Sequence, residues 1–257
     1  MLASPIAIPA FNDNYIWAIC HEGQCAVVDP GDAAPVERFL EEKGLNLAAI
    51  LITHHHPDHV GGINALIADR QIPVYGPARE TIPGMTCPLE DNQQITVDAL
   101  GISLTVLDVP GHTLGHIAYH DADNGWLFCG DTLFAGGCGR LFEGTPSQMH
   151  ASLHRLAELP AQTQVYCAHE YTLANLTFAI AVTPDDQRVQ ARFAAVTTAR
   201  EQGHITLPTT VAEECHTNPF LRTAEPAIQA ACESREPGSA NDDVQYFASL
   251  RRWKDNF

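Results

Sequence analysis

The densest group of potential metal ligands in this chain is the heptapeptide Thr-His-His-His-Pro-Asp-His at residues 53–59. Imidazole nitrogens and carboxylate oxygens are the ligands that suit zinc and related divalent metals. Side chains two positions apart point one way and those four and five positions on point another, so one tetrahedral ion cannot easily take four ligands from this stretch. The spacing fits two adjacent ions better, one bound by His54 and His56 and the other by Asp58 and His59. A solvated histidine-rich loop is the alternative.

A buried strand is expected directly before this loop. Residues 47–53 form a continuous apolar run with β-branched members, which is typical of a strand buried on both faces. Three later strand-like runs also end on a potential ligand, namely His112, Asp131 and His169. A lone histidine after a strand is usually a surface or core residue. Four such strand ends in one chain indicate ligands that sit on a rigid base.

The seven candidate ligands divide into two sets and a bridge. Three histidines can serve one ion, an aspartate with two histidines can serve the other, and one aspartate is left to bridge: His54, His56 and His112; Asp58, His59 and His169; and Asp131. Two-metal hydrolases hold their ions about 3.5–4 Å apart, which leaves room for a hydroxide between them. The sequence therefore predicts a site for metal-assisted hydrolysis.

The His-x-His-x-Asp-His pattern of residues 54–59, together with the three later ligands, resembles the metallo-β-lactamase superfamily. Further segments resemble glyoxalase II, the hydroxyacylglutathione hydrolase family, and extend the resemblance over almost the whole chain: residues 9–15, 28–31, 110–116, 130–139, 142–145, 167–172, 218–222 and 251–257. The superfamily pattern is specific for a metal site but not for a substrate. The C-terminal segments and the Gly-Gly-Cys-Gly sequence at 136–139 point to glutathione thioesters.

Two regions of the chain differ in pattern. Up to about residue 170 short strands alternate with short helices, which indicates sheets covered by helices. The resemblance implies an α/β catalytic domain at residues 1–170, the metallo-β-lactamase-like αββα sandwich. Helical periodicity punctuated by prolines predicts a small helical C-terminal domain at 171–257, which the resemblance makes the substrate-binding domain. We expect strands near 15–20, 25–29, 47–53, 73–75, 94–97, 102–109, 116–120, 126–129 and 164–167, and helices near 34–43, 60–68, 146–158, 174–182, 186–202, 225–233 and 244–252.

The resemblance also implies which side chains contact the glutathione moiety: Arg140, Phe142, Tyr171, Arg251 and Lys254. Arg140 and Phe142 stand where other members carry lysine and tyrosine. Arginine still binds a carboxylate, often with two hydrogen bonds, whereas Phe142 must act by packing alone. The cations near residue 254 could instead offset the dipole at the end of a helix.

Three residues near the ligands have more than one interpretation. Pro57 departs from the family, in which a histidine or a larger residue commonly stands at this position. Proline biases the preceding residue toward extended backbone, so we expect a stiffer loop that keeps its ligands. Asp29 and His116 are candidates for fixing the ligand imidazoles through hydrogen bonds, or for purely structural roles.

Composition excludes several classes of protein. The net charge is −17, with two lysines and twelve arginines, and nucleic-acid binding needs a basic face. No apolar stretch is long enough for a membrane span, and no signal peptide is evident. The eight cysteines form no Cys-x-x-Cys pair and are expected to be free thiols in a reducing cytoplasm. We expect a cytoplasmic monomer without nucleic-acid or membrane partners.

The leading hypothesis is hydrolysis of S-D-lactoylglutathione and related S-2-hydroxyacylglutathiones to D-lactate and glutathione, the second step of methylglyoxal detoxification by the glyoxalase pathway. A metal-bound hydroxide attacks the thioester carbonyl, Asp58 accepts or relays its proton, and Asp131 bridges the two ions. Zinc is expected, with iron or manganese as alternatives. The competing hypotheses are another enzyme of the superfamily, such as a lactonase, a β-lactamase or a mononuclear iron sulfur-dioxygenase, and a metal-binding scaffold without activity.

Overall fold

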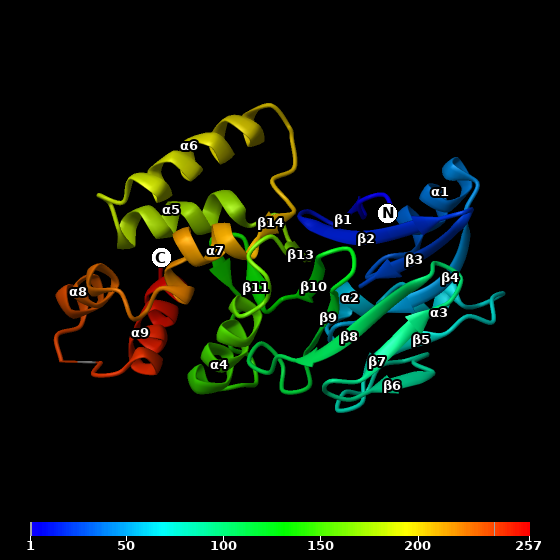
Figure 1. The fold of residues 1–257 in the computed structure, drawn as a ribbon, viewed down its shortest axis with the longest axis horizontal. Helices are drawn as coiled ribbons and strands as arrows, with labels where there is room; N and C mark the ends of the chain where they lie inside the picture. Colours follow the sequence, from blue (N-terminus) through cyan, green and yellow to red (C-terminus); the bar gives the residue numbers. More distant parts are fainter. Residues whose placement is uncertain (1, 239) are drawn as a thin grey trace. The chain divides into compact units, whose positions relative to one another are not determined.

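The computed structural model describes residues 2–238 and 240–257, and these fall into two compact units (Figure 1). The N-terminal unit runs up to Asp108 and also contains Leu114–Gly130. The C-terminal unit consists of Val109–Thr113 and Asp131–Phe257. Of the candidate ligands, those of residues 54–59 belong to the N-terminal unit, and the three later ones belong to the C-terminal unit.

The N-terminal unit contains two groups of paired strands. The first is a six-stranded sheet in the order β1-β2-β3-β4-β5-β6, antiparallel from β1 to β3 and parallel from β3 to β6. Its strands are β1 (Ile6–Ala10), β2 (Asn14–His21), β3 (Gln24–Val28), β4 (Asn46–Leu51), β5 (Val74–Pro77) and β6 (Cys87–Leu89). The second is an antiparallel group in the order β10-β9-β8-β7, with β7 (Gln94–Val97), β8 (Ile102–Asp108), β9 (Ile117–Asp121) and β10 (Trp126–Gly130).

Helix α1 (Ala33–Lys43) completes one core of this unit, together with the short helix α3 (Ile63–Leu66). Helix α1 begins after Asp32, whose side chain accepts from the Ala34 amide, and ends at Gly44 in the left-handed region. Its apolar face packs with the sheet in one cluster: Ile8, Val27, Val36, Leu40, Ile50, Ile63 and Leu66 among others. Because β4 lies inside this core, the ligand loop that follows it starts from a fixed point.

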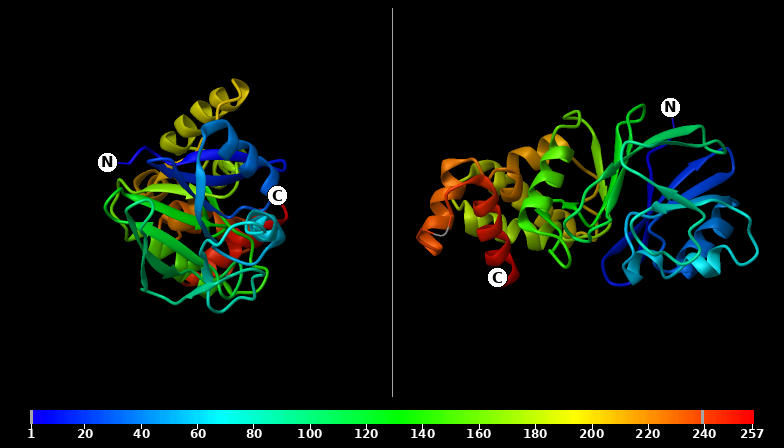
Figure 2. Two further views of the ribbon diagram at one scale, coloured as in Figure 1. Left: turned by 90° about the vertical axis from the view of Figure 1, so that its right-hand side faces the viewer. Right: turned by 90° about the horizontal axis from the view of Figure 1, so that it is seen from below.

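The C-terminal unit is mainly helical. Its strands are short: β11 (Leu133–Phe134) pairs with β12 (Gly137–Cys138), and β13 (Gln164–Cys167) pairs with β14 (Thr209–Thr210). Its helices are α4 (Pro146–Ala157), α5 (Thr172–Val182), α6 (Gln187–Glu201), α7 (Val211–Thr217), the 3₁₀ turn η1 (Pro219–Leu221), α8 (Pro226–Arg235) and α9 (Asp243–Asp255). Helix α6 lies along α5 (Figure 1), and α9 packs beside α4 (Figure 2, right). Phe220 joins these helices, because its ring contacts Phe178 of α5 and Phe247 of α9.

Most of the expected elements are confirmed, but one helix and several short elements differ. The helix expected near 60–68 is two turns, α2 (Pro57–Val60) and α3, because the Gly62 amide donates to the Pro30 carbonyl at 2.9 Å and not to the carbonyl four residues before it. Sequence patterns missed β1, β6, β11, β12, β14 and α7. The strands of two or three residues among these show no period, so tertiary contacts decide them. The boundary at residue 170 between separately folding domains stays a prediction.

Candidate metal centre

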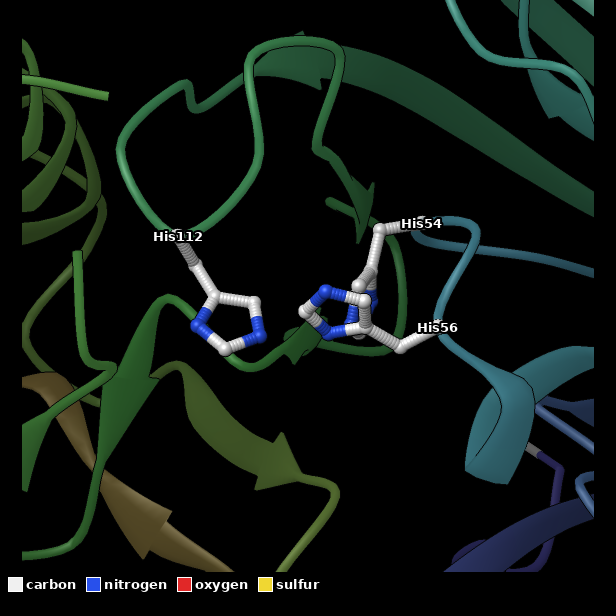
Figure 3. Close-up of side chains that lie close together, drawn as sticks. All are labelled: His54, His56 and His112. Carbon is white, nitrogen blue, oxygen red and sulfur yellow. The ribbon is translucent and has the colours of Figure 1, made fainter. Parts of the chain in front are cut away.

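His54 and His56 project from the loop that follows β4 (Figure 3). Nε2 of His54 lies 3.1 Å from Nδ1 of His56. Two ligands on one tetrahedral ion, at zinc–nitrogen distances of about 2.0–2.1 Å, lie roughly 3.3–3.4 Å apart. His56 is the extended residue before α2 (φ −62°, ψ 145°), as expected from Pro57 at the first helical position. The pair therefore has the spacing of two ligands on one cation.

Asp58 and His59 lie one turn further on, in α2. Nε2 of His59 is 3.4 Å from Oδ2 of Asp58, which is again the spacing of two ligands on one ion. The Asn14 side chain, at the start of β2, donates to the same carboxylate oxygen at 3.0 Å. A side chain at Gly31 would place its Cβ 1.7 Å from the Asp58 carbonyl oxygen, so only glycine allows this turn to approach so closely.

Asp29 fixes the protonation of two of these histidines. Its carboxylate can only accept, so His59 Nδ1, at 3.0 Å, must carry the proton and donate it. The Thr53 hydroxyl donates to Asp29 at 2.7 Å, so its oxygen accepts from His54 Nδ1 at 3.1 Å. In both imidazoles Nε2 is left with its lone pair. Asp29 itself has a left-handed backbone (φ 54°) directly after β3, and it also accepts from the Thr53 amide.

His116 has a different relation to the ligands. Its ring stacks on that of His54, with centroids 4.5 Å apart and 17° between the planes. Its Nδ1 donates to the carbonyl of Ile117 at 3.0 Å. Of the two residues expected to fix an imidazole by hydrogen bonding, Asp29 is confirmed, whereas His116 supports His54 by ring packing.

His55 pairs with an acidic side chain, and its ring also contacts the ring of His56, with centroids 5.1 Å apart. Its Nδ1 lies 3.0 Å from Oε2 of Glu80, whose side chain is 4% exposed. The other oxygen of Glu80 accepts from the Gly115 amide at 3.2 Å. Glu80 therefore ties the ligand loop to the loop before β9, and His55 has a structural partner in place of a metal.

Asp131 stands between two histidines in the C-terminal unit. Its Oδ2 lies 3.4 Å from Nε2 of His112, and its Oδ1 lies 3.3 Å from Nε2 of His169. The carbonyl of Arg140 accepts from His112 Nδ1 at 2.9 Å, which leaves the lone pair of His112 on Nε2. Asp131 therefore presents one carboxylate oxygen to each of the two histidines.

The donor set fits divalent metal ions. Three of the imidazoles have their Nδ1 proton fixed by a protein acceptor, and the ligand pairs lie 3.1–3.4 Å apart within each unit. Hydrogen bonds to the non-ligating nitrogen are usual for metal-bound histidine. Each unit therefore supplies pairs of nitrogen and oxygen donors of the kind that zinc, iron and manganese bind.

A pocket of about 440 Å³ opens beside Asp131 and His112 in the C-terminal unit. Its wall contains all five side chains expected to contact glutathione: Arg140, Phe142, Tyr171, Arg251 and Lys254. Phe134, Cys138, Ala174 and Asn175 complete it. Cys138 belongs to the Gly-Gly-Cys-Gly sequence that pointed to glutathione, whereas the sequence patterns did not single out the other three.

The three cations of the pocket are held differently. Arg251 is 5% exposed; it donates to the Cys138 carbonyl at 3.0 Å and to Asp255 at 2.9 Å. The side chain of Arg140 is 68% exposed. Lys254 donates to the Ala174 carbonyl at 3.1 Å, and burial, with the charges of Arg251 and Arg140, lowers its pKa to about 8. Arg140 and Lys254 therefore have more capacity for a new carboxylate than Arg251.

Aromatic rings connect the pocket to the ligands. The ring of Tyr171 stacks on His169, with centroids 4.7 Å apart, and Phe134 contacts both rings edge-on. The ring of Phe142 meets His112 edge-on at 5.2 Å, although the residue is 63% exposed. An acyl chain or a peptide backbone could pack on these faces without polar contacts.

Comparisons with known proteins give the family. A model of the metallo-beta-lactamase superfamily matches residues 11–169, and a model described as hydroxyacylglutathione hydrolase C-terminus matches residues 170–257. The hydroxyacylglutathione hydrolase of Cupriavidus taiwanensis is 58% identical over 262 residues, which cover 97% of each chain. The chain belongs to the hydroxyacylglutathione hydrolase family, within the metallo-beta-lactamase superfamily.

Solved structures agree on the fold of this family member. ETHE1 from Myxococcus xanthus has a TM-score of 0.66 and 23% identity, covering 99% of this chain and 98% of the other. TTHA1623 in a di-iron-bound form has a TM-score of 0.59 and 28% identity, covering 85% and 100%. The expected metallo-β-lactamase-like α/β fold with a helical C-terminal part is thereby confirmed. Within the described residues no helix has both the length and the apolar character that a membrane crossing requires.

Proposed function

We propose that this chain hydrolyses S-D-lactoylglutathione and related S-2-hydroxyacylglutathiones to D-lactate and glutathione, the second step of methylglyoxal detoxification by the glyoxalase pathway. The observation that carries the proposal is identity of 58% over 97% of the chain to a hydroxyacylglutathione hydrolase. The pocket of the C-terminal unit supports it, because cations and aromatic rings line its wall.

The catalytic centre in this proposal is a pair of divalent ions. His54, His56 and His112 would hold one ion, Asp58, His59 and His169 would hold the other, and Asp131 would be the carboxylate shared between them. The ligand spacings within each unit support metal binding by these residues, and the di-iron-bound form of TTHA1623 supports a pair of ions. Zinc is the metal we propose, and iron and manganese are the alternatives that the same donors accept.

When bound, such ions supply a hydroxide near neutral pH and positive charge for the developing oxyanion. The chain's own residues prepare that chemistry. Asp29 keeps the Nδ1 proton on His59 and, through Thr53, on His54, so both rings present Nε2. Asn14 fixes the carboxylate of Asp58, to which we assign acceptance of the proton from the nucleophile. A thiolate leaves readily, so this chemistry needs no strong general acid.

The pocket binds the glutathione moiety. We assign its carboxylates to Arg140 and Lys254, with Tyr171 and Phe142 packing against the tripeptide. Arg251 contributes indirectly to substrate binding. Its guanidinium already binds the Cys138 carbonyl and Asp255, and its positive charge helps to lower the pKa of Lys254. Charge-assisted hydrogen bonds to carboxylates are stronger than neutral ones, so this pocket favours an anionic tripeptide over a neutral lactone.

The setting of the enzyme is also part of the proposal. All eight cysteines are free thiols, which supports a reducing cytoplasm. The net charge of −17 supports a chain without nucleic-acid partners, and we propose that it acts as a monomer. The adjoining matches at residues 11–169 and 170–257 support a catalytic domain up to residue 170 and a substrate-binding domain after it.

Steady-state hydrolysis of S-D-lactoylglutathione, a lactone and a β-lactam by one preparation tests the function, with elemental analysis of the same sample. We expect about two divalent ions per chain and a kcat/KM for the glutathione thioester at least about a hundredfold above the other substrates, equivalent to roughly 2.7 kcal/mol of transition-state discrimination. Equal activity on a lactone or a β-lactam would contradict the proposed substrate. Full activity on the thioester without bound metal would contradict the proposed centre.

A further inference from the structure

Two cysteines face each other at the far end of the β2–β3 hairpin from the ligand loop. Cys20 of β2 and Cys25 of β3 are direct cross-strand partners, and their Sγ atoms lie 3.6 Å apart. The proposed hydrolysis uses neither thiol. The two side chains are therefore placed for chemistry with each other, independently of the metal centre.

The turn between the strands decides the kind of cross-strand position that they occupy. Glu22 and Gly23 form a two-residue loop, and both have positive φ, 45° and 80°. Such loops are flanked by a hydrogen-bonded pair, here His21 and Gln24. The next pair, Cys20 and Cys25, is then a non-hydrogen-bonded pair, in which Cα atoms lie about 4.5 Å apart. Disulfides bridge Cα atoms about 4.4–6.8 Å apart, so these strands can be linked with little movement.

The two thiols differ in access. Cys20 is partly exposed, whereas Cys25 is fully buried. The hydrogen bond between the thiols lowers the pKa of Cys20, and the same bond together with burial raises the pKa of Cys25. A thiolate on Cys20 is the species able to attack a disulfide from solution, and Cys25 is the group placed to attack next.

We propose that Cys20 and Cys25 form a reversible redox modification site for small-molecule disulfides, of which oxidised glutathione is the representative. The Cys20 thiolate attacks one sulfur of the small disulfide, the sulfur–sulfur bond breaks, and one thiolate leaves. Cys25 attacks the Cys20 sulfur, the bond from that sulfur to the small molecule breaks, and the departing sulfur takes the Cys25 proton and leaves as a thiol. The two protein thiols are oxidised to one disulfide, and the small disulfide is reduced to two thiols. The exchange involves neither metal nor thioester, so it does not rest on the proposed function.

Cys215 provides a matched control. It is also partly exposed, but it lies in α7 of the C-terminal unit, where burial and Glu214 raise the pKa of its thiol. A thiol with a raised pKa offers less thiolate for exchange. We therefore expect Cys20 to react with oxidised glutathione at least about tenfold faster than Cys215, since each pKa unit changes the thiolate fraction about tenfold.

The experiment uses the full-length, metal-loaded protein in glutathione buffers of increasing oxidised fraction. Remaining thiols are alkylated, and peptides are mapped by mass spectrometry. The unmodified sequence should give a disulfide between Cys20 and Cys25 that reduced glutathione reverses. Cys20→Ser should give none, and Cys25→Ala should accumulate a glutathione adduct on Cys20. Cys215→Ser should behave like the unmodified sequence.

The oxidised protein should also melt a few degrees above the reduced one, because the bond closes the hairpin. Failure to find the Cys20–Cys25 disulfide at any oxidised fraction would overturn the proposal. So would glutathione adducts spread equally over Cys20 and Cys215. If Cys25→Ala does not fold, the peptide map of the unmodified sequence still decides between these outcomes. Hydrolysis measured on the reduced sample tests the proposed function separately.

Discussion

His54 and His59 are fully buried in the N-terminal unit, whereas Arg140 and Phe142 stand largely exposed around the pocket of the C-terminal unit. The buried ligands are held by a network that begins at Asp29 and includes Thr53. The exposed side chains depend on few fixed partners. This difference indicates where substitutions can accumulate: an imidazole out of place by an ångström loses its metal, but a pocket cation can be replaced by another.

The departures from the family pattern follow that division. Arg140 and Phe142, which stand where the family resemblance implies a lysine and a tyrosine, both lie in the exposed wall of the pocket. Pro57 is a departure within the ligand loop, at a position that is itself exposed, and it begins α2 with His56 in the extended conformation that proline favours. The loop accepts this residue because proline at the first helical position needs no hydrogen bond.

The largest effect is expected at Asp131, the carboxylate that contacts two histidines. Asp131→Ala should lower the metal content toward one ion or none per chain and abolish measurable hydrolysis, while the fold survives. Elemental analysis, circular dichroism and kcat on the thioester measure these three properties. A variant that keeps two ions and near-normal turnover would refute the bridging assignment.

A smaller loss is expected at Asp29, which binds no metal in our assignment. Asp29→Asn replaces one of the two carboxylate oxygens with an NH2 group, which cannot accept. Either the Thr53 amide or the pair formed by His59 Nδ1 and the Thr53 hydroxyl then loses its acceptor. Hydrogen-bonding partners of ligand histidines typically contribute about 10–100-fold in metal affinity or activity. Competition with a chelator measures the affinity. Unchanged affinity in a folded Asp29→Asn protein would show that the tautomers are fixed in another way.

Lys254 should make substrate binding depend on pH. Its pKa is lowered to about 8 by burial and by Arg251 and Arg140, so the ammonium is present below that pH and is lost as the pH rises through it. A bound carboxylate favours the charged form, so KM for the glutathione thioester should increase above about pH 8. Lys254→Ala should raise KM about tenfold at neutral pH. This is the lower end of the effect expected for a charge-assisted hydrogen bond, because the ammonium group is partly exposed.

Lys254→Arg is the matched control, because arginine keeps its charge throughout this range. It should remove the increase in KM at high pH while kcat keeps the pH profile of the unmodified enzyme. An increase in KM that persists in Lys254→Arg would assign the pH dependence to another group.

The smallest effect is expected at His55, the histidine between two ligands. Because His55 pairs with Glu80, His55→Ala should keep the metal content and cost about 1 kcal/mol of stability, the typical value of a hydrogen bond. Chemical denaturation and elemental analysis measure both. The two ring nitrogens of His54 contact Thr53 and His56. His54→Ala should therefore lose metal under the same conditions. Equal metal loss in both variants would favour a histidine-rich loop without a built site.

The sequence alone predicted the ligand set and the strand-like runs that precede it. Each ligand follows a strand-like run, and periods of two and 3.6 residues are local properties that survive without tertiary information. The same reasoning located most strands and helices, and the motifs identified the family. It did not locate β11, β12 or α7, since elements this short owe their conformation to neighbours such as Glu214, which accepts from the Gly136 amide.

The tertiary structure decided how those residues are held. Asn14 and Asp58 are 44 positions apart, and Asp29 and His59 are 30 apart; no spacing rule connects such pairs. The three pocket cations look alike in the sequence, but the tertiary structure makes them different. Arg251 donates to the Cys138 carbonyl, so Lys254 and Arg140 have more capacity to bind a carboxylate in the pocket. Residue types and local periods can be read from the sequence. The partner of a buried polar group depends on which strands pack together, and this packing is fixed only when the core forms.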